Sequence, residues 1–389
     1  MIQEKIEKYN RAKCTGCHAC KTSCPVDCIS METDAEGFWY PKVSEACINC
    51  EKCIKVCHIF KDNSIDNFPT AYACINQDEE IRMSSSSGGV FYALAKQVIS
   101  EEGVAFGAAF NEKFELEHSY TETLEGIKKY QGSKYVQSKI GNCYAETKQF
   151  LQAGRQVLFS GTPCQIGGLK AYLRKEYNNL FCVDIICHGV PSPMVWGRYV
   201  KYQQQKNNAN ISRLTFRDKT EGWKNYNVKF DFKAKASVKE FFGDNIYMKV
   251  FLKDLCLRPS CYNCDFKTLN RQSDITLADF WGVQQVLPEM DDDKGTSLIF
   301  VNSHNGSERM AELSEGIKSQ KVDVCSAIKY NPSAIKSVAR PSKRESFLDA
   351  VVKKDFAEVV KEYTRISLQV RVVQLGRRFL SKTYRMLFK

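Results

Sequence analysis

Hydrophobic and polar positions at the start of the long second segment predict strands on either side of a helix. TAYACIN at 70–76 and VAFGAAF at 104–110 are largely apolar runs of strand length. Between them, apolar residues recur at helical spacing over 90–99, and the serine- and glycine-rich stretch 84–89 leads into that helix. LEHSY at 116–120 adds a further strand.

The following segment has the pattern of a parallel βαβ unit. QVLFSG at 156–161 and LFCVDIICHG at 180–189 are apolar enough for buried strands, and residues 162–177 between them have helical character. Cys164 and Cys187 come just after the two strands. Open α/β sheets place their sites at the carboxyl ends of parallel strands, so both thiols are predicted at that edge.

Alternating polar and apolar residues over 211–240 indicate antiparallel strands, and SLIFVNS at 297–303 is a short further strand among helical segments. Residues 341–389 change character, because no acidic residue follows Glu362. Two interpretations of this tail stay open: a helix that packs its apolar side on the protein, and a helix that docks on a membrane surface. The basic residues in the last part of the tail include Arg371, Arg377, Arg378, Lys382, Arg385 and Lys389.

The first 60 residues contain the most specific motif of the chain, a C-x2-C-x2-C-x3-C spacing that occurs twice. This is the ligand spacing of a bacterial ferredoxin with two 4Fe-4S clusters, in which the fourth cysteine of each run binds the other cluster. Crossing the fourth ligands predicts two sets. The first set is Cys14, Cys17, Cys20 and Cys57, and the second set is Cys47, Cys50, Cys53 and Cys24.

The alternatives for these cysteines are a zinc module and a disulfide framework. Structural zinc sites usually place two ligands together and two more after a long gap, whereas here three cysteines crowd each run. Disulfides suit secreted proteins, and the first residues, MIQEKIEK, carry no apolar signal segment. We therefore favour two iron–sulfur clusters, and interpret Cys28, which has no place in the motif, as a packing residue.

A second cysteine run, Cys256, Cys261 and Cys264, has C-x4-C-x2-C spacing and needs one more ligand to hold a cluster. Cys187 or Cys164 at the predicted sheet edge could supply it, and we favour Cys187. The soft thiolate set favours a third 4Fe-4S cluster over a zinc knuckle or free thiols.

Composition narrows the compartment and the partners. The chain has 389 residues, 18 cysteines and a formal net charge of +11. Its length suggests two or three domains, and many cysteines without a signal segment predict a cytoplasmic, metal-binding protein. No apolar run approaches the ~18 residues of a membrane span. The basic charge suits an acidic electron carrier or an anionic substrate, and no nucleic-acid-binding motif is present.

Six motifs occur in a fixed order: SSSGGVF, GSKYVQS, GTPCQ, ICHGVPSP, the second cysteine run and LADFWG. Together they resemble the beta-subunit family of coenzyme F420 hydrogenases and dehydrogenases over about residues 70–340, and an N-terminal ferredoxin is a common addition in that family. The resemblance implies a flavin, normally FAD, beside an iron–sulfur cluster. Bacterial members with such a head resemble proteins of surface-polysaccharide gene clusters.

The resemblance also implies where the flavin binds. The serine- and glycine-rich loop before the helix can hold a phosphate through backbone N–H groups and hydroxyls, although an ordinary helix cap is the alternative. Lys134 would oppose a phosphate or the charge of the reduced flavin. His188 is a candidate proton donor, with a purely structural role as the alternative. The flavin-binding candidates are Ser86, Ser87, Gly88, Gly89, Gly132, Ser133 and Lys134.

The predicted fold class is α+β and multidomain. A bacterial 2x 4Fe-4S ferredoxin fold at 1–62 precedes an α/β flavin- and iron–sulfur-binding domain in two parts, 70–142 and 143–340, and a helical tail follows at 341–389.

Three functions stay open: a flavin-dependent oxidoreductase acting on a small molecule or glycan, an electron-transfer subunit serving a partner, and an iron–sulfur scaffold. The expected redox partner is a protein such as ferredoxin. The expected location is the cytoplasm, with the inner face of the membrane as the alternative if the tail docks there.

Overall fold

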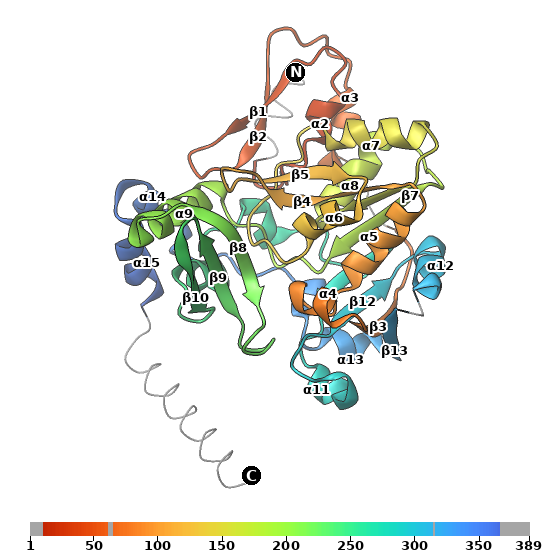
Figure 1. Cartoon of the computed structure of the whole chain (residues 1–389). Coiled ribbons are helices and arrows are strands. Elements are labelled where there is room, and N and C mark those ends of the chain that lie inside the picture. The colour runs from red at the N-terminus through yellow and green to blue at the C-terminus, as the bar shows by residue number, and fades with distance from the viewer. Residues whose placement is uncertain (1–10, 61–64, 314–315, 366–389) are drawn as a thin grey trace.

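The computed structural model describes residues 11–60, 65–313 and 316–365 (Figure 1). In Figure 1 the cysteine-rich head lies at the top, above a large sheet, and a smaller sheet lies beside the large one. The small sheet is an insertion. Along the chain, its strands come between two strands that lie next to each other in the large sheet.

The head is built on a β-hairpin. β1 (Ile29–Thr33) pairs antiparallel with β2 (Trp39–Val43). The Asp34 carboxylate closes the turn by accepting hydrogen bonds from the backbone N–H groups of Glu36 and Phe38, as an Asx turn does. The cysteine runs continue into short helices: α2 (Ala19–Thr22), α3 (Lys52–Lys55) and the 3-10 helix η1 (His58–Phe60).

The large sheet has eight strands in the order β13-β3-β12-β11-β7-β6-β4-β5. Its centre, β4-β6-β7-β11, is parallel, and the outer strands pair antiparallel. The predicted strand–helix–strand unit is confirmed as β6, α8 and β7. The strands are β3 (Thr70–Asn76), β4 (Val104–Phe110), β5 (Leu116–Thr121), β6 (Val157–Ser160), β7 (Leu180–Ile185), β11 (Ile275–Asp279), β12 (Ser297–Val301) and β13 (Ile317–Val322).

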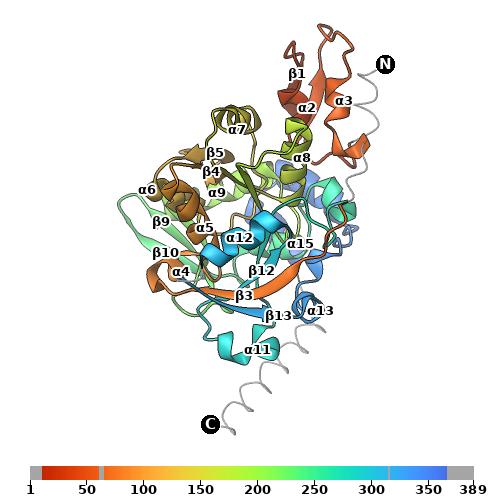
Figure 2. The same ribbon diagram turned by 90° about the vertical axis from the view of Figure 1, so that its right-hand side faces the viewer.

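Helices cover both faces of this sheet. Successive residues of a strand point to opposite faces, so a strand that is apolar throughout needs cover on both sides. Val157 and Phe159 pack with α7 (Cys143–Gln152) and α8 (Pro163–Leu173), whereas Leu158 between them packs with α5 (Val90–Ser100). Figure 2 shows the head at the end of the molecule that carries α7 and α8, opposite α11 and α13. The remaining helices here are α4 (Glu79–Ser84), α6 (Leu124–Ile127), η2 (Lys128–Tyr130), α11 (Val283–Val286), η4 (Pro288–Met290), α12 (His304–Glu312), α13 (Val324–Ile328) and η5 (Pro332–Ala334).

The small sheet has the order β10-β9-β8, with both pairs antiparallel, as the alternation over 211–240 predicts. Helices that precede and follow it in sequence pack on it in one hydrophobic core. The strands are β8 (Ile211–Asp218), β9 (Asn227–Phe232) and β10 (Lys235–Phe241), and the helices are α9 (Pro193–Asn207), α10 (Ile246–Leu252), α14 (Arg344–Lys353) and α15 (Phe356–Thr364).

The predicted tail at 341–389 divides into two parts. Helices α14 and α15 are part of the core of the small sheet, where Phe347, Val351 and Val359 are fully buried. The basic side chains from Arg371 to Lys389 lie outside the described residues. Within the described residues, no helix has the length and apolarity that crossing a membrane requires.

Candidate iron–sulfur and flavin site

The ferredoxin cysteines gather into the two crossed sets that their spacing predicts. Cys24 lines one pocket of the head together with Cys47, Cys50 and Cys53 of the second run. The other set is close enough to interact: burial and the neighbouring thiols of Cys17, Cys14 and Cys57 raise the pKa of Cys20. Burial likewise raises the pKa of Cys57 to about 12. Metal binding offsets this cost, because the ligands must be thiolates.

Cys28 also lines the pocket of the second set. Its Sγ lies 3.4 Å from that of Cys24, and burial raises its pKa to about 12. Cys28 therefore borders a cluster site as a neutral thiol. The C-x2-C-x2-C-x3-C spacing contains no signal for this neighbour.

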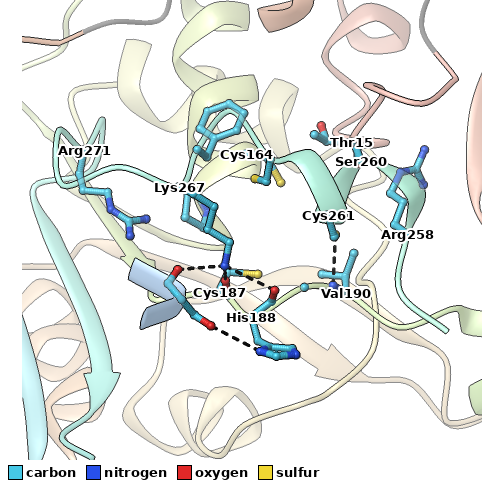
Figure 3. A pocket seen from close by; sticks show the side chains of 15 residues that line it. Thr15, Cys164, Cys187, His188, Val190, Arg258, Ser260, Cys261, Lys267 and Arg271 are labelled. Carbon is cyan, nitrogen blue, oxygen red and sulfur yellow. Dashed lines mark hydrogen bonds between the residues drawn. The ribbon is translucent and has the colours of Figure 1, made fainter. Parts of the chain in front are cut away.

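A second pocket lies where the head meets the large sheet, and four cysteines line it: Cys164, Cys187, Cys261 and Cys264 (Figure 3). Its empty space is about 470 Å³, open solvent at its mouth included. We refer to it as the four-cysteine pocket. In Figure 3 the sulfur atoms of Cys164 and Cys187 approach it from different elements.

The topology explains how these cysteines meet. β6 and β7 are parallel neighbours, so Cys164 at the start of α8 and Cys187 beyond β7 lie at the same edge of the sheet. The 3-10 helix η3 (Pro259–Asn263) brings Cys261 and Cys264 against that edge. The sequence predicts that a cysteine at the sheet edge meets the second cysteine run, but it leaves open whether that cysteine is Cys164 or Cys187. The structure places both at the pocket.

Cys256, the first member of the predicted run, does not reach the pocket. Its side chain is fully buried in the core of the small sheet, and burial raises its pKa to about 12. The structure therefore replaces it with Cys164 as the fourth cysteine around this space. Among the described residues, no group of three or more His, Cys, Asp or Glu is placed to hold a single metal ion.

The four-cysteine pocket also has a positive rim, made by Arg258, Lys267 and Arg271. Four thiolates carry a large negative charge, so cations at the rim favour the ligating form of the cysteines. A 4Fe-4S cluster needs four cysteines around one space. The residues at this pocket fit such a group in number, chemistry and charge.

The head contacts the rim of the four-cysteine pocket directly. Thr15 lines it, and Arg258 donates from Nε to the Cys14 carbonyl at 2.7 Å and from Nη2 toward the Cys14 Sγ at 3.7 Å. On α8, a Cβ at Gly168 would lie 3.0 Å from the Sγ of Cys17. One set of ferredoxin cysteines therefore lies against the helix that begins at the pocket.

His188 lines the same pocket. Its Nε2 lies 2.6 Å from a carboxylate oxygen of Asp254, and its Nδ1 lies 3.4 Å from the hydroxyl of Ser333. Its ring packs edge-on against Phe251. Both ring nitrogens are thus engaged by protein groups, and the Ser333 hydroxyl, which also lines the pocket, is the route by which the ring could exchange a proton with a group there.

The two loops proposed to bind flavin lie side by side. The backbone N–H of Ser133 donates to the hydroxyl of Ser86. Lys134 is buried and donates to the carbonyls of Tyr130, Gln131 and Gly132, and burial lowers its pKa to about 7. In this structure the ammonium group of Lys134 therefore stabilises the loop to which Lys134 belongs.

Gly88 of the first loop is required by the fold itself. A Cβ at Gly88 would lie 2.8 Å from the backbone nitrogen of Ser297 on β12. The Gly88 carbonyl accepts a hydrogen bond from the N–H of Asn76 at the end of β3. Gly88 is therefore needed for a close approach of the loop to the sheet, whatever ligand the loop binds.

Three residues near these loops, Arg217, Lys219 and Trp223, were not singled out from the sequence. Lys219 donates to the carbonyl of Ser87, and Trp223 donates to the carbonyl of Ser86. Arg217 pairs at 2.8 Å with Asp279 of the LADFWG motif. The three residues belong to the alternating strand β8 and the turn after it, so the sequence indicated only strands there.

The comparisons with known proteins agree with this arrangement. Residues 154–324 match the family model that describes the carboxyl terminus of the beta subunit of coenzyme F420 hydrogenase/dehydrogenase. Residues 7–30 and 44–66 match two models of 4Fe-4S binding domains. A comparison with curated proteins gave no match.

Among solved structures, the chain is similar to one in the F420-reducing [NiFe] hydrogenase complex from Methanosarcina barkeri. The two share 16% sequence identity over 67% of this chain and 84% of that chain, with a TM-score of 0.44. The matched models place two 4Fe-4S motifs before the beta-subunit region. Residues 154–324 therefore match the coenzyme F420 hydrogenase/dehydrogenase beta-subunit family, and ferredoxin-type 4Fe-4S motifs precede them in the chain.

Proposed function

We propose that this protein is an iron–sulfur flavoprotein oxidoreductase that takes electrons from the two clusters of its head, through a third cluster, to FAD and on to a substrate or carrier. One observation carries the proposal: cysteines from three separate segments line a single pocket, and the head borders that pocket through Thr15. Iron–sulfur clusters supply single-electron transfer, and a flavin joins it to two-electron chemistry.

The residues support an ordered path. Cys50 of the second set, which we call the outer set, is exposed, and this suits exchange with an external redox protein. Cys14 and Cys17 of the first set, the inner set, contact Arg258 and α8, next to the four-cysteine pocket. The path from the surface to the pocket therefore passes through the head.

Beyond the pocket, aromatic rings lead toward the two loops. The ring centres of His188 and Phe251 lie 5.2 Å apart, and those of Phe251 and Tyr135 lie 4.8 Å apart. Tyr135 directly follows the loop of Ser133 and Lys134. A flavin bound by these loops would lie at the far end of this row of rings, with His188 at the pocket as the nearer proton donor.

Phosphate binding in the first loop would use the hydroxyls of Ser86 and Ser87 and the N-terminal end of α5. Lys134 and Lys219 would supply positive charge once their carbonyl partners rearrange. Burial lowers the pKa of Lys219 to about 7, as it does for Lys134. An anion beside either ammonium group would raise its pKa again.

The family supports a second candidate, an electron-transfer subunit without a substrate of its own. The matched model describes a beta subunit, and a subunit passes electrons to a partner enzyme. The two candidates share the head and the four-cysteine pocket. They differ in whether a substrate reaches the flavin in this chain.

The decisive experiment is anaerobic purification with iron, sulfide and flavin quantitation. We expect about twelve irons per chain if three four-cysteine sites fill. Cys261→Ser with Cys264→Ser should remove about four of them and leave the clusters of the head. Iron that is unchanged in this double variant would refute the third cluster.

The flavin is tested in the same preparation. Bound flavin that is bleached by reduced ferredoxin supports the flavoprotein, and its rate of bleaching should fall in the double variant. Protein that has three clusters but no flavin would leave only the electron-transfer subunit.

Two finer proposals are a glycan substrate in surface-polysaccharide synthesis, which comes from the resemblance, and membrane docking by the tail, which comes from its basic residues. Turnover of candidate sugar substrates by the reduced protein tests the first. Deletion of 366–389 tests the second, because each basic side chain near an anionic lipid surface contributes about 1 kcal/mol. Full-length protein that does not bind anionic vesicles at low salt would refute docking.

A further inference from the structure

The three cations at the four-cysteine pocket differ in how their N–H groups are used. Arg258 donates from Nε to the Cys14 carbonyl, from Nη1 to Gln137 and from Nη2 to the Trp39 carbonyl. Lys267 donates to the carbonyls of Cys187 and Ser333. Both side chains are therefore engaged with the protein around the pocket.

Arg271 is not engaged in the same way. Nη2 donates to the carbonyl of Ala334 at 3.1 Å, but Nε and Nη1 are buried and have no hydrogen-bond partner. The side chain is only 2% exposed. Leaving a buried charged donor unsatisfied costs free energy. Nη1 has only an ion-pair contact of 3.7 Å with Asp184, which is beyond hydrogen-bond distance. Both N–H groups therefore indicate a hydrogen-bond acceptor that the protein itself does not supply.

The position of Arg271 indicates which hydrogen-bond acceptor its free N–H groups would meet. Arg271 lines the same pocket as the four cysteines, and Figure 3 shows it on the side of Lys267 and Cys187. Sulfur atoms of an iron–sulfur cluster and its thiolates accept hydrogen bonds. Such hydrogen bonds and the local charge are known determinants of the reduction potential of a cluster.

We propose that Arg271 donates its free N–H groups to the iron–sulfur cluster of the four-cysteine pocket and raises the reduction potential of that cluster above those of the two head clusters. This inference rests on the proposed third cluster. The reduced cluster is one unit more negative than the oxidised one, so a guanidinium beside it stabilises the reduced form. One electron then moves from the head to the pocket, and no bond is made or broken and no proton is needed.

Asp184 sets the strength of this effect. Its carboxylate lies 3.7 Å from Nη1 of Arg271, and both side chains are almost completely buried. Burial raises the pKa of Asp184, and the charge of Arg271 opposes that rise. A negative charge behind the guanidinium weakens the pull of Arg271 on an electron, so the two residues should shift the potential in opposite directions.

The test is a redox titration of the anaerobically purified full-length protein, followed by electron paramagnetic resonance. In Arg271→Gln, the ratio of reduced to oxidised pocket cluster at a fixed potential should fall about tenfold, which is about 59 mV for one electron. In Asp184→Asn the ratio should rise. The two head clusters are the internal control and should keep their potentials in both variants.

Arg271→Lys provides a matched comparison, because it keeps the charge but loses the planar fork of donors. Its shift should have the same sign as that of Arg271→Gln and be smaller. If Arg271→Gln loses iron, Arg271→Lys and Asp184→Asn decide the question, since each changes the rim less.

The outcomes separate the two levels of the proposal. Wild-type protein with about eight irons and no third signal would remove the third cluster itself. A third cluster whose potential is unchanged in Arg271→Lys and Asp184→Asn, or moves the same way in both, would overturn the role of Arg271 and leave the cluster in place.

Discussion

Cys256 and Cys261 are five positions apart, yet they belong to different environments. Cys256 is fully buried among apolar side chains of the small sheet, whereas Cys261 lines the four-cysteine pocket. Spacing along a chain shows which thiols could meet, but burial shows which thiols face a common space. The spacing therefore marks a segment whose cysteines lie in two environments, and of its three thiols only Cys261 and Cys264 line the pocket.

The first prediction compares these two cysteines. Cys256→Ala should keep all iron and lose about 1 kcal/mol of stability through a small cavity. Cys261→Ala should lose about four irons. Iron and sulfide quantitation of the two variants, purified side by side without oxygen, measures the difference. Loss of iron in Cys256→Ala would return Cys256 to the ligands.

Lys134 gives a prediction about pH. Burial lowers its pKa from 10.5 to about 7, so between these two values the unfolded chain binds more protons than the folded chain. Stability attributable to Lys134 therefore rises as pH increases through this window. Lys134→Met should remove this contribution. The denaturation midpoint of the wild type should therefore rise relative to that of Lys134→Met as the pH increases from about 7 to about 9.5. A midpoint difference that is independent of pH would contradict the lowered pKa.

Helix α8 shows what a single element contributes. It begins with Cys164 at the four-cysteine pocket, and one turn later Gly168 lies against Cys17 of the head. Because a helix rises about 1.5 Å per residue, these two contacts are held at a fixed short spacing. The rigid helix thus sets how far the inner head cysteines lie from the pocket.

The prediction for this helix concerns Gly168. A Cβ there would lie 2.8 Å from the Tyr144 hydroxyl and 3.0 Å from the Cys17 Sγ. Gly168→Ala should therefore cost about 1–3 kcal/mol through overpacking and alter the resonance spectrum of the inner head cluster.

Gly197 of α9 is the matched control for Gly168, because a Cβ there meets nothing within 4 Å. Gly197→Ala should stabilise the protein by up to about 1 kcal/mol. Equal effects of the two substitutions on stability and spectrum would show that the head does not press on α8.

At this scale the sequence predicted many elements correctly. Alternation identified β8 and β9, and apolar runs identified β6 and β7. It did not predict the place of α14 and α15, because an amphipathic helical segment has the same sequence pattern whether its apolar side meets solvent, lipid or a distant sheet. The order of the eight strands is also set by pairings between residues far apart in sequence, which local pattern does not encode.

In the whole molecule, the head is fixed by two buried arginines on neighbouring elements. Arg344 of α14 is fully buried and pairs with both carboxylate oxygens of Glu36 in the hairpin turn. It also donates to the carbonyl of Leu257, next to Arg258. A head held in this way keeps one geometry toward the four-cysteine pocket.

The prediction at this scale is that Glu36→Ala destabilises the whole protein. It removes the bidentate partner of the fully buried guanidinium of Arg344, which then keeps only a longer contact of 3.5 Å with a carboxylate, that of Glu345, at a cost on the order of 3 kcal/mol. Urea denaturation followed by circular dichroism measures this cost.

Arg340→Ala is the control, because the Arg340–Glu345 pair is about half exposed and such pairs contribute up to about 1 kcal/mol. If the two variants lose the same stability, the ion pair of Arg344 does not anchor the head.

The distribution of the cysteines along the chain also fixes an order of maturation. Every proposed ligand of the head lies between residues 14 and 57, so both head sites are complete while the ribosome is still adding the large sheet. The four-cysteine pocket needs residues from 164 to 264 and a folded sheet edge. If the proposed third cluster binds there, its insertion is consequently the late step, and a cell short of iron should accumulate protein with filled head sites and an empty four-cysteine pocket.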